Sequence, residues 1–472
     1  MKKILPGLVA LSLLSAGLPG CNSKLNVQPT SYIDSSQAFS SASDVQAALV
    51  SCYAGLQSVN LYGGYLQFMT DLLGDNGDEY FKGTFTQPAE AQRKLLLTTN
   101  SQVSATWLSA YDVINRTNYV LANVSKLSTA AQQAAGEGEA KFIRSLVYFD
   151  LVRMFGRAWN DGTPTANPGV PLILTPTLTI SDAQPVARNT VADVYAQIIT
   201  DLTTAEARLT TSNGGLNAFS ATRYACAALL ARVYLQQGDY AKAANAANRA
   251  LALPQSGLNA FYGANFGFTT TNVSAAVVPI TTNANTIEDI FTIQITAQSG
   301  TNQLRTFYSR ASRSDVVIQP QFLNLFEPND SRQSLYVTVT TSQPVYTYTR
   351  KYDAQYGNIK LIRLDEMLLT RAEANLRAGT TLGATPLADV NAIRTRAGLP
   401  ALTSVTLAQV LKERRIELAF EGLRLGDLKR TMDSTIDPGT GAAITWNSPR
   451  LVFPIPFREL NVNPKLTQND GY

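Results

Sequence analysis

The sequence predicts a mainly α fold, a right-handed α-superhelix of helix pairs with an irregular, loop-rich half that contains short strands. Two observations support this prediction. Residues 224–254 have the pattern of two helices joined by a tight turn, with Ala227, Leu230, Ala231 and Tyr234 spaced along one helix face. Between residues 257 and 357 the helical period mostly disappears, and Thr, Asn, Ser and aromatic residues dominate.

The turn within residues 224–254 defines the helix pair. We expect Gly238 to end the first helix, because Gly enters the left-handed conformation without a Cβ penalty. Asp239 can then cap the second helix. Gly238, Tyr240, Ala243 and Ala250 occupy the spacings of a tetratricopeptide repeat, a unit of about 34 residues. One such unit cannot bury its own apolar face, so other helices must stack against it.

Helical patterns on both sides of this pair supply the neighbours. Helices are predicted over residues 44–58, 107–127, 137–155, 190–209, 361–378, 387–397 and 407–421. Residues 137–155 are apolar nearly all round, so this helix should be buried. Residues 60–85 mix Gly, aromatic and acidic residues without a period, which predicts a structured loop. Alternation over 291–296 predicts a half-buried strand, and residues 346–348 suggest another.

Composition and charge limit the possible functions. The formal net charge is +4, and loss of Lys2 and Lys3 with a leader would lower it by two, to about +2, so we expect no nucleic-acid partner. The chain contains no His, which removes Ser-His-Asp and Cys-His catalysis and the common zinc sites. No Gly-rich phosphate loop of the right form is present. Any enzyme would therefore have to use carboxylates, Lys, Tyr or a bound cofactor, and we expect no cofactor.

The N-terminus has the pattern of a targeting segment. Lys2 and Lys3 precede a short apolar run that ends before Cys21. This arrangement is typical of a secretory signal, and a Cys directly after a small residue resembles a bacterial lipoprotein cleavage box. Cys21 would then become the lipidated first residue, anchored to a membrane by its acyl chains. An ordinary signal with an incidental Cys is the alternative.

These patterns predict the domain organisation. The predicted parts are a lipoprotein signal peptide at 1–20, a lipidated tether at 21–43, and a single domain at 44–472. Within that domain we expect a helical N-terminal half at 44–256, a loop and short-strand insert at 257–357, a helical part at 358–430 and an irregular tail at 431–472.

Six stretches, together with the box at Cys21, resemble the SusD/RagB family of outer-membrane lipoproteins. They are GEAKFIRSLVYFDLVRMFG (138–156), ATRYACAALLARVYLQQGDYAKA (221–243), IRLDEMLLTRAEANLRAG (362–379), VNAIRTRAGLP (390–400), LKERRIELAFEGLRLGDLKR (411–430) and NPKLTQNDGY (463–472). They span almost the whole chain beyond the leader in the family's order. Asp470 departs from the family pattern, which has Pro before the final Gly-Tyr.

The resemblance implies a function. It implies a non-enzymatic binding lipoprotein, exposed on the cell surface at the outer membrane, which captures oligosaccharide or polysaccharide. Its partner would be a SusC-like TonB-dependent barrel transporter, which imports the glycan. The family also includes proteins that bind peptides or other nutrients, so a peptide ligand stays open. The family's sugar-binding residues are not fixed by its motifs.

A carboxylate-dependent glycosidase is a second alternative. Glu417 and Glu421 could act as acid and base if they flanked a sugar about 5–10 Å apart and one had a raised pKa. Neighbouring Arg residues would instead hold both carboxylates ionised. The simpler interpretation of this charged run is therefore a salt-bridge network, formed by Glu413, Arg414, Arg415, Glu417, Glu421, Arg424, Asp427 and Arg430.

Ligand residues are predicted from chemistry alone. Sugars present apolar C–H faces that stack on aromatic rings, while their hydroxyls need polar partners. The candidates are Tyr62, Tyr65, Asp75, Asn76, Asp78, Tyr80, Trp159, Phe307 and Tyr308. For each aromatic residue, packing beneath a loop is the alternative. Oxygen ligands at Asp75 and Asp78 could also hold a structural calcium ion, with a solvated turn as the alternative.

Overall fold

The computed structural model describes residues 41–472, apart from 180–181, 183, 211–217, 261, 268–281, 301 and 341–343. The predicted signal peptide and Cys21 lie outside the described residues. The predicted fold class is confirmed, since the described residues are 51% helix and 8% strand. The helices are α1 (Ala42–Leu56), α2 (Tyr65–Gly74), α3 (Thr86–Gln92), α4 (Ser101–Asn123), α5 (Ala130–Phe155), α6 (Val191–Arg208), α7 (Arg223–Gln237), α8 (Tyr240–Ala250), α9 (Gln303–Tyr308), α10 (Pro320–Leu323), α11 (Leu364–Ala378), α12 (Pro386–Arg396), α13 (Leu407–Glu417), α14 (Arg424–Thr431) and α15 (Phe457–Val462).

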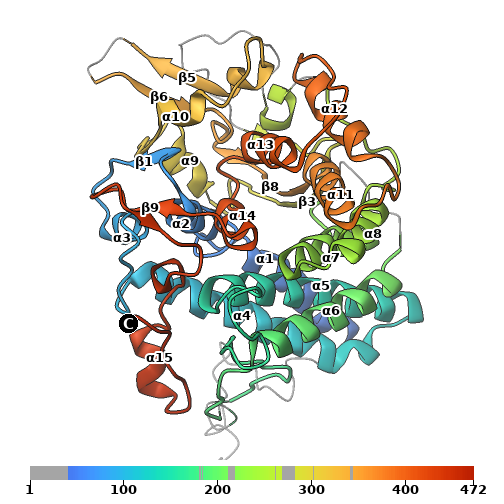
Figure 1. Cartoon of the computed structure of the whole chain (residues 1–472). Coiled ribbons are helices and arrows are strands. Elements are labelled where there is room, and N and C mark those ends of the chain that lie inside the picture. The colour runs from blue at the N-terminus through green and yellow to red at the C-terminus, as the bar shows by residue number, and fades with distance from the viewer. Residues whose placement is uncertain are drawn as a thin grey trace, which may run out of the picture. The chain divides into compact units, whose positions relative to one another are not determined.

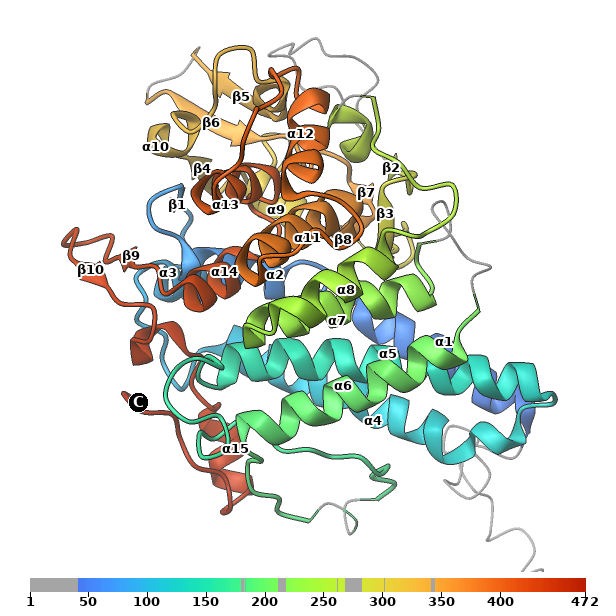
Figure 2. The same cartoon turned by 45° about the vertical axis from the view of Figure 1, so that its right-hand side comes forward.

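The long helices stack in chain order. The succession α1, α4, α5, α6, α7, α8, α11 and α12 brings each helix into contact with the next. Figures 1 and 2 show α4, α5 and α6 as a lower layer, α7 and α8 above it, and α11 to α13 above these. As predicted from its all-round apolar sequence, the C-terminal half of α5 is buried. Stacking thus gives the repeat-like pair the apolar neighbours that it lacks alone.

The α7–α8 turn forms as the sequence predicts. Gly238 has a φ of 75° and ends α7 in the left-handed conformation. The Asp239 side chain accepts a hydrogen bond from the Lys242 backbone N–H at 3.2 Å, which caps α8. Ala243 and Ala247 are fully buried. Their small side chains let α8 approach its neighbours closely.

Several helix predictions are wrong in detail. Ser41, not Asp44, is the N-cap of α1, and Asp44 completes the capping box by accepting from the Ser41 N–H. Residues 60–85 are not only loop, because they contain α2 and a strand. The helix predicted from residue 361 begins at Leu364, since residues 359–363 form a strand. At the last two places tertiary pairing overrides the local pattern, whereas the start of α1 is set by the local capping box.

The strands are short and mostly antiparallel. They are β1 (Glu79–Phe81), β2 (Thr282–Asn283), β3 (Asp289–Ile293), β4 (Val316–Ile318), β5 (Tyr336–Val339), β6 (Tyr346–Thr349), β7 (Tyr356–Gly357), β8 (Ile359–Arg363), β9 (Thr435–Ile436) and β10 (Ala443–Ile444). One sheet has the order β1-β4-β6-β5, and the pairs β3-β8, β2-β7 and β9-β10 stand apart. Strand β3 is buried throughout, not half-buried as predicted. Helix α7 packs against it in addition to its partner strand β8.

Candidate functional site

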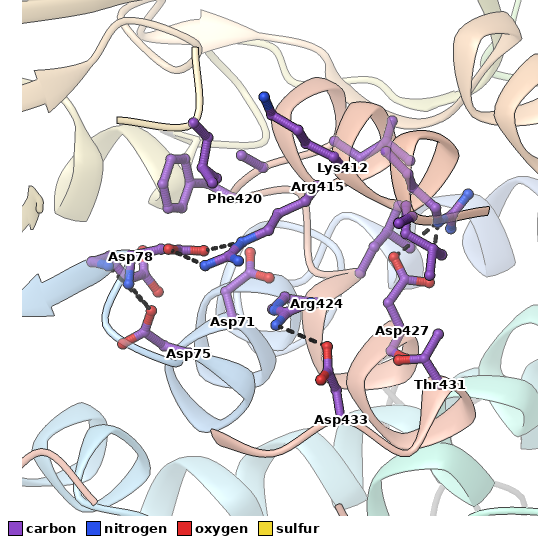
Figure 3. Close-up of a pocket in the computed structure, with 18 residues that line it drawn as sticks. Asp71, Asp75, Asp78, Lys412, Arg415, Phe420, Arg424, Asp427, Thr431 and Asp433 are labelled. Atoms are coloured by element: carbon purple, nitrogen blue, oxygen red, sulfur yellow. Dashed lines mark hydrogen bonds and ion pairs between the residues drawn. The ribbon is translucent and has the colours of Figure 1, made fainter. Parts of the chain in front are cut away.

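A pocket of about 300 Å³ lies between α2, α13 and α14. Its lining residues are Asp71, Asp75, Asp78, Glu79, Leu325, Ala408, Leu411, Lys412, Arg414, Arg415, Leu418, Ala419, Phe420, Leu423, Arg424, Asp427, Thr431 and Asp433 (Figure 3). The end of α2 is pressed against α14, since a Cβ on Gly74 would lie 2.6 Å from the Leu425 backbone. This close approach places the acidic loop after α2 beside the charged residues of α13 and α14.

The acidic loop is held by its own hydrogen bonds. The Asp75 carboxylate accepts from the backbone N–H groups of Gly77, Asp78 and Glu79 at 3.0, 2.7 and 3.1 Å. The Asp78 carboxylate is paired with the Arg415 guanidinium, whose Nε lies 2.9 Å away. The predicted residues Asp75 and Asp78 therefore do lie together at one pocket. Arg415 also donates to the Asn76 side-chain oxygen at 3.0 Å, so Asn76 lies beside the same pair.

The arrangement does not provide the calcium ligands that the sequence suggested. Oxygens of Asp75 and Asp78 are directed at backbone N–H groups and at Arg415 rather than at a shared position. Within the described part of the chain, no group of three or more Asp, Glu or Cys side chains is placed to hold a metal ion.

Two further carboxylates lie at the floor of the pocket. Asp71 and Glu79 are each 3% exposed. Gly422 donates its backbone N–H to Asp71 Oδ2 at 2.7 Å, whereas Asp71 Oδ1 and both Glu79 oxygens accept no hydrogen bond. Burial raises the pKa of Asp71 to about 7. Burial also raises the pKa of Glu79 well above its ordinary value, the charges of Asp71 and Asp75 raise it further, and the Tyr308 hydroxyl lowers it.

The Glu417 and Glu421 carboxylates belong to a buried ion-pair network. Arg363 Nη2 lies 2.8 Å from Glu421 Oε1, and Arg396 Nη2 lies 2.9 Å from Glu417 Oε1. Burial alone would raise the pKa of Glu417, but the guanidinium groups of Arg396 and Arg363 outweigh it and hold that pKa well below its usual range. The pKa of Glu421 is lowered in the same way by Arg363 and Lys351, against the effect of burial. Neither group has the raised pKa that a glycosidase acid requires.

A second surface candidate is one face of the four-stranded sheet. In β1 the side chain of Tyr80 points outward, 49% exposed, and lies opposite Val317 of β4. The next residue of β4, Ile318, pairs with Thr347 on the other face. Since residues alternate between faces, Tyr346 and Tyr348 share the face of Tyr80.

We call this surface the tyrosine face, defined by Tyr80, Lys82, Val317, Tyr346 and Tyr348. The Lys82 Nζ lies 5.4 Å from the centre of the Tyr346 ring and 5.9 Å from that of Tyr348. The face is formed by strands far apart in the chain, and Figure 1 shows β1, β6 and β5 on the same side of the molecule. The exposed Tyr80 ring and the half-buried Tyr346 ring, with Lys82 on the same face, offer stacking and hydrogen bonding, whereas Val317 and Tyr348 are buried.

The remaining predicted residues lie elsewhere. Tyr62, Phe307 and Tyr308 are buried in the core, and the Tyr62 hydroxyl donates to Asp150 Oδ2 at 2.7 Å. A ligand on the surface does not reach these three side chains. Half-buried Tyr65 packs edge-on against Phe307, with ring centres 5.3 Å apart. Trp159 packs on a different part of the chain, against a tyrosine of α6 at 5.0 Å.

Sequence reasoning missed several residues of these two surfaces. It assigned Arg415 and Arg424 only to a salt-bridge network, although both line the pocket. It gave Lys82 no role, because no local pattern shows that β1 pairs with β4 and brings Lys82 near β6. The alternation of Tyr346 and Tyr348 with Thr was the available signal for the tyrosine face.

No helix in the portion of the chain that the structure describes is long and apolar enough to cross a membrane.

Comparison with known proteins shows which protein families the chain matches. Residues 324–472 match the SusD family, and residues 25–235 match the family described as "Starch-binding associating with outer membrane". A similar curated protein is SusD-like protein P38 of Formosa agariphila, which is 26% identical over an alignment covering 98% of each chain.

Solved structures agree with this assignment. A putative sugar binding protein from Bacteroides vulgatus superposes with a TM-score of 0.77 at 28% identity, covering 92% of this chain and 99% of that one. A laminarin binding SusD-like protein superposes with a TM-score of 0.72 at 23% identity, covering 92% of this chain and 100% of that one. Together with the family matches at both ends, these similarities show that the chain belongs to the SusD/RagB family.

Proposed function

We propose that this protein is a cell-surface lipoprotein that captures oligosaccharide or polysaccharide and delivers it to a SusC-like TonB-dependent transporter. Family membership supports this proposal, as do the structural relatives named for sugar and laminarin binding. Cys21 would anchor the protein in the outer membrane by its lipid. The ligand is held by binding alone, and the transporter supplies the energy for import.

The tyrosine face is the observation that most supports glycan binding. Tyr80 presents its ring to solvent, and Lys82, two residues further along the same face, supplies N–H donors near Tyr346. An exposed, rigid aromatic surface with a polar group at its edge suits a sugar, whose ring has an apolar face and hydroxyls around it.

Binding to immobilised polysaccharides tests the proposal. The purified chain is run through native gels that contain laminarin, starch or another polysaccharide, and its retardation is measured. We expect retardation by at least one glycan, and loss of about tenfold in affinity for Tyr80→Ala and Tyr346→Ala. Phe457→Ala is the matched control, because Phe457 is an exposed aromatic residue of α15 outside the tyrosine face. Equal loss in the control would contradict the assignment of the face.

Two alternatives have their own outcomes. Retention on immobilised peptides, with none on any glycan, would identify a peptide-binding member of the family. Release of reducing sugar by the purified protein, abolished in Glu417→Gln, would overturn the proposal that the protein is not an enzyme. The lowered pKa of Glu417 disfavours this second outcome, because that carboxylate stays ionised at neutral pH.

A further inference from the structure

The pocket between α2, α13 and α14 contains acceptors without donors. Asp71 and Glu79 are more than nine-tenths buried and both line the pocket. Three of their four side-chain oxygens have no partner at hydrogen-bond distance, although the buried Tyr308 hydroxyl lies close enough to Glu79 to lower its pKa. A buried carboxylate without donors is unfavourable, so either a proton or a ligand must compensate it. This pair is therefore different from Asp75 and Asp78, whose oxygens accept from backbone N–H groups and from Arg415.

Arg414 and Arg415 beside the pocket are already engaged, whereas Lys412 is exposed at its surface and Arg424 is only partly engaged. Arg415 is paired with Asp78, and Arg414 Nε lies 2.8 Å from Asp427 Oδ2. Arg424 differs, since its Nε has no acceptor and Asp433 is 4.0 Å from its Nη2. Figure 3 shows Asp71 and Arg424 at the same opening. The pocket therefore offers buried acceptors and one unsatisfied donor to the same occupant.

We propose that this pocket binds an amino sugar whose nitrogen carries no acyl group. The ammonium donates to Asp71 and Glu79, and a neighbouring hydroxyl accepts from Arg424 Nε. A hexosamine has both groups on adjacent carbons, whereas a simple alkylamine lacks the acceptor and a neutral sugar lacks the charge. The inference rests on the proposed function, because it names the kind of sugar that the protein selects.

Other occupants fit less well. A metal ion would need several converging ligands, and the described residues contain no such group of three. An anion would lie against the buried carboxylates of Asp71 and Glu79, whose charges would oppose the attraction of Arg424 and Lys412. Leu418, Phe420 and Leu423 supply an apolar wall for the C–H face of a sugar ring. At about 300 Å³ the pocket lies at the lower end of the range of small-ligand sites, which suits roughly one ring.

Titration calorimetry of the full chain with three sugars tests this inference. The probes are glucosamine, N-acetylglucosamine and glucose, which differ in the ammonium group but share the ring. We expect glucosamine to bind at least about tenfold more tightly than the other two. Equal affinities, or no binding of glucosamine, would overturn the inference. This comparison uses the unmodified protein, so it does not depend on whether any variant folds.

Variants then locate the site. Asp71→Asn and Glu79→Gln should each weaken glucosamine binding about tenfold, with folding checked by circular dichroism. Asp112→Asn is the matched control, because this Asp is exposed on α4 and should leave the affinity within about twofold. Unchanged affinity in both pocket variants would overturn the inference. If glucosamine fails to bind while polysaccharide retention still depends on Tyr80, only the inference fails and the proposed function stands.

Discussion

At the scale of single residues, Asp71 links stability to pH. Burial raises its pKa in the folded chain from 3.8 to about 7. The stability that the protonated form contributes is therefore complete below pH 3.8 and is lost as the pH rises through about 7. We predict that Asp71→Asn, which keeps the acceptor for the Gly422 N–H, stabilises the protein on the order of 4 kcal/mol more at pH 8 than at pH 4.

Urea unfolding of the parent and of Asp71→Asn at both pH values measures this difference. The exposed Asp112→Asn variant is the control, and its effect should be nearly the same at both pH values. If Asp71→Asn changes stability equally at pH 4 and pH 8, the carboxyl is not held protonated by burial.

Arg363 is the residue whose removal should cost most stability. It is fully buried and lies 2.8 Å from Glu421 Oε1 and 3.6 Å from Glu417 Oε1, besides pairing with Asp365. Arg363→Met would leave Glu421 and Asp365 buried without their main cation, and Glu417 with Arg396 but without Arg363. We predict a loss of about 3–5 kcal/mol in the free energy of unfolding, measured by urea denaturation.

Lys242→Met is the comparison for Arg363→Met. The Lys242–Asp239 pair lies on the surface, where an ion pair contributes less than about 1 kcal/mol. Similar losses in the two variants would show that the Arg363 network contributes no more than a surface pair.

At the scale of elements, the α7–α8 turn needs Gly238 for its backbone conformation, and not because a side chain there would clash with its neighbours. Gly238 has a φ of 75°, and a Cβ there would meet only the Tyr240 ring at 3.8 Å, an ordinary contact. Gly238→Ala should therefore cost about 1–2 kcal/mol, the price of the left-handed conformation for a residue with a Cβ. Thermal unfolding measures this loss. A neutral substitution would mean that the turn can relax without cost.

Local chemistry explains which elements could be predicted from the sequence. The end of α7 at Gly238, the Asp239 cap and the buried face of α5 depend on neighbours within a few residues. The region 60–85 was predicted as loop because its aromatic residues have no single period. There, Phe68 of α2 stacks on Phe307 with ring centres 4.1 Å apart, a contact between distant parts of the chain. Such contacts decide the structure of that region.

The same limit applies to the candidate site. The sequence pattern indicated the acidic loop and Tyr80 as candidate ligand residues. Which of the candidate side chains are exposed to solvent depends on the fold, and the sequence does not show it. Phe307 and Tyr308 were plausible sugar-stacking residues, yet α2 and the sheet bury both of them. The register of β1 on β4, which creates the tyrosine face, is a long-range pairing that no local pattern indicates.

At the scale of the whole molecule, we expect the stacked helices and the irregular half to have different roles. The tyrosine face is built on strands, and the pocket lies at the ends of short helices, whereas α7 and α8 belong to the stacked layers (Figure 2).

We predict that the double variant Lys242→Ser with Asn245→Ser, at two exposed positions of α8, leaves glycan affinity within about twofold but weakens association with the transporter. Tyr80→Ala should do the reverse, since it removes a ligand contact and leaves the helical layers unchanged. Calorimetry with the glycan and co-purification of the transporter from membranes measure the two effects separately. Loss of glycan affinity in the α8 variant, with the fold intact, would contradict this division, because it would place recognition on the helical layers instead.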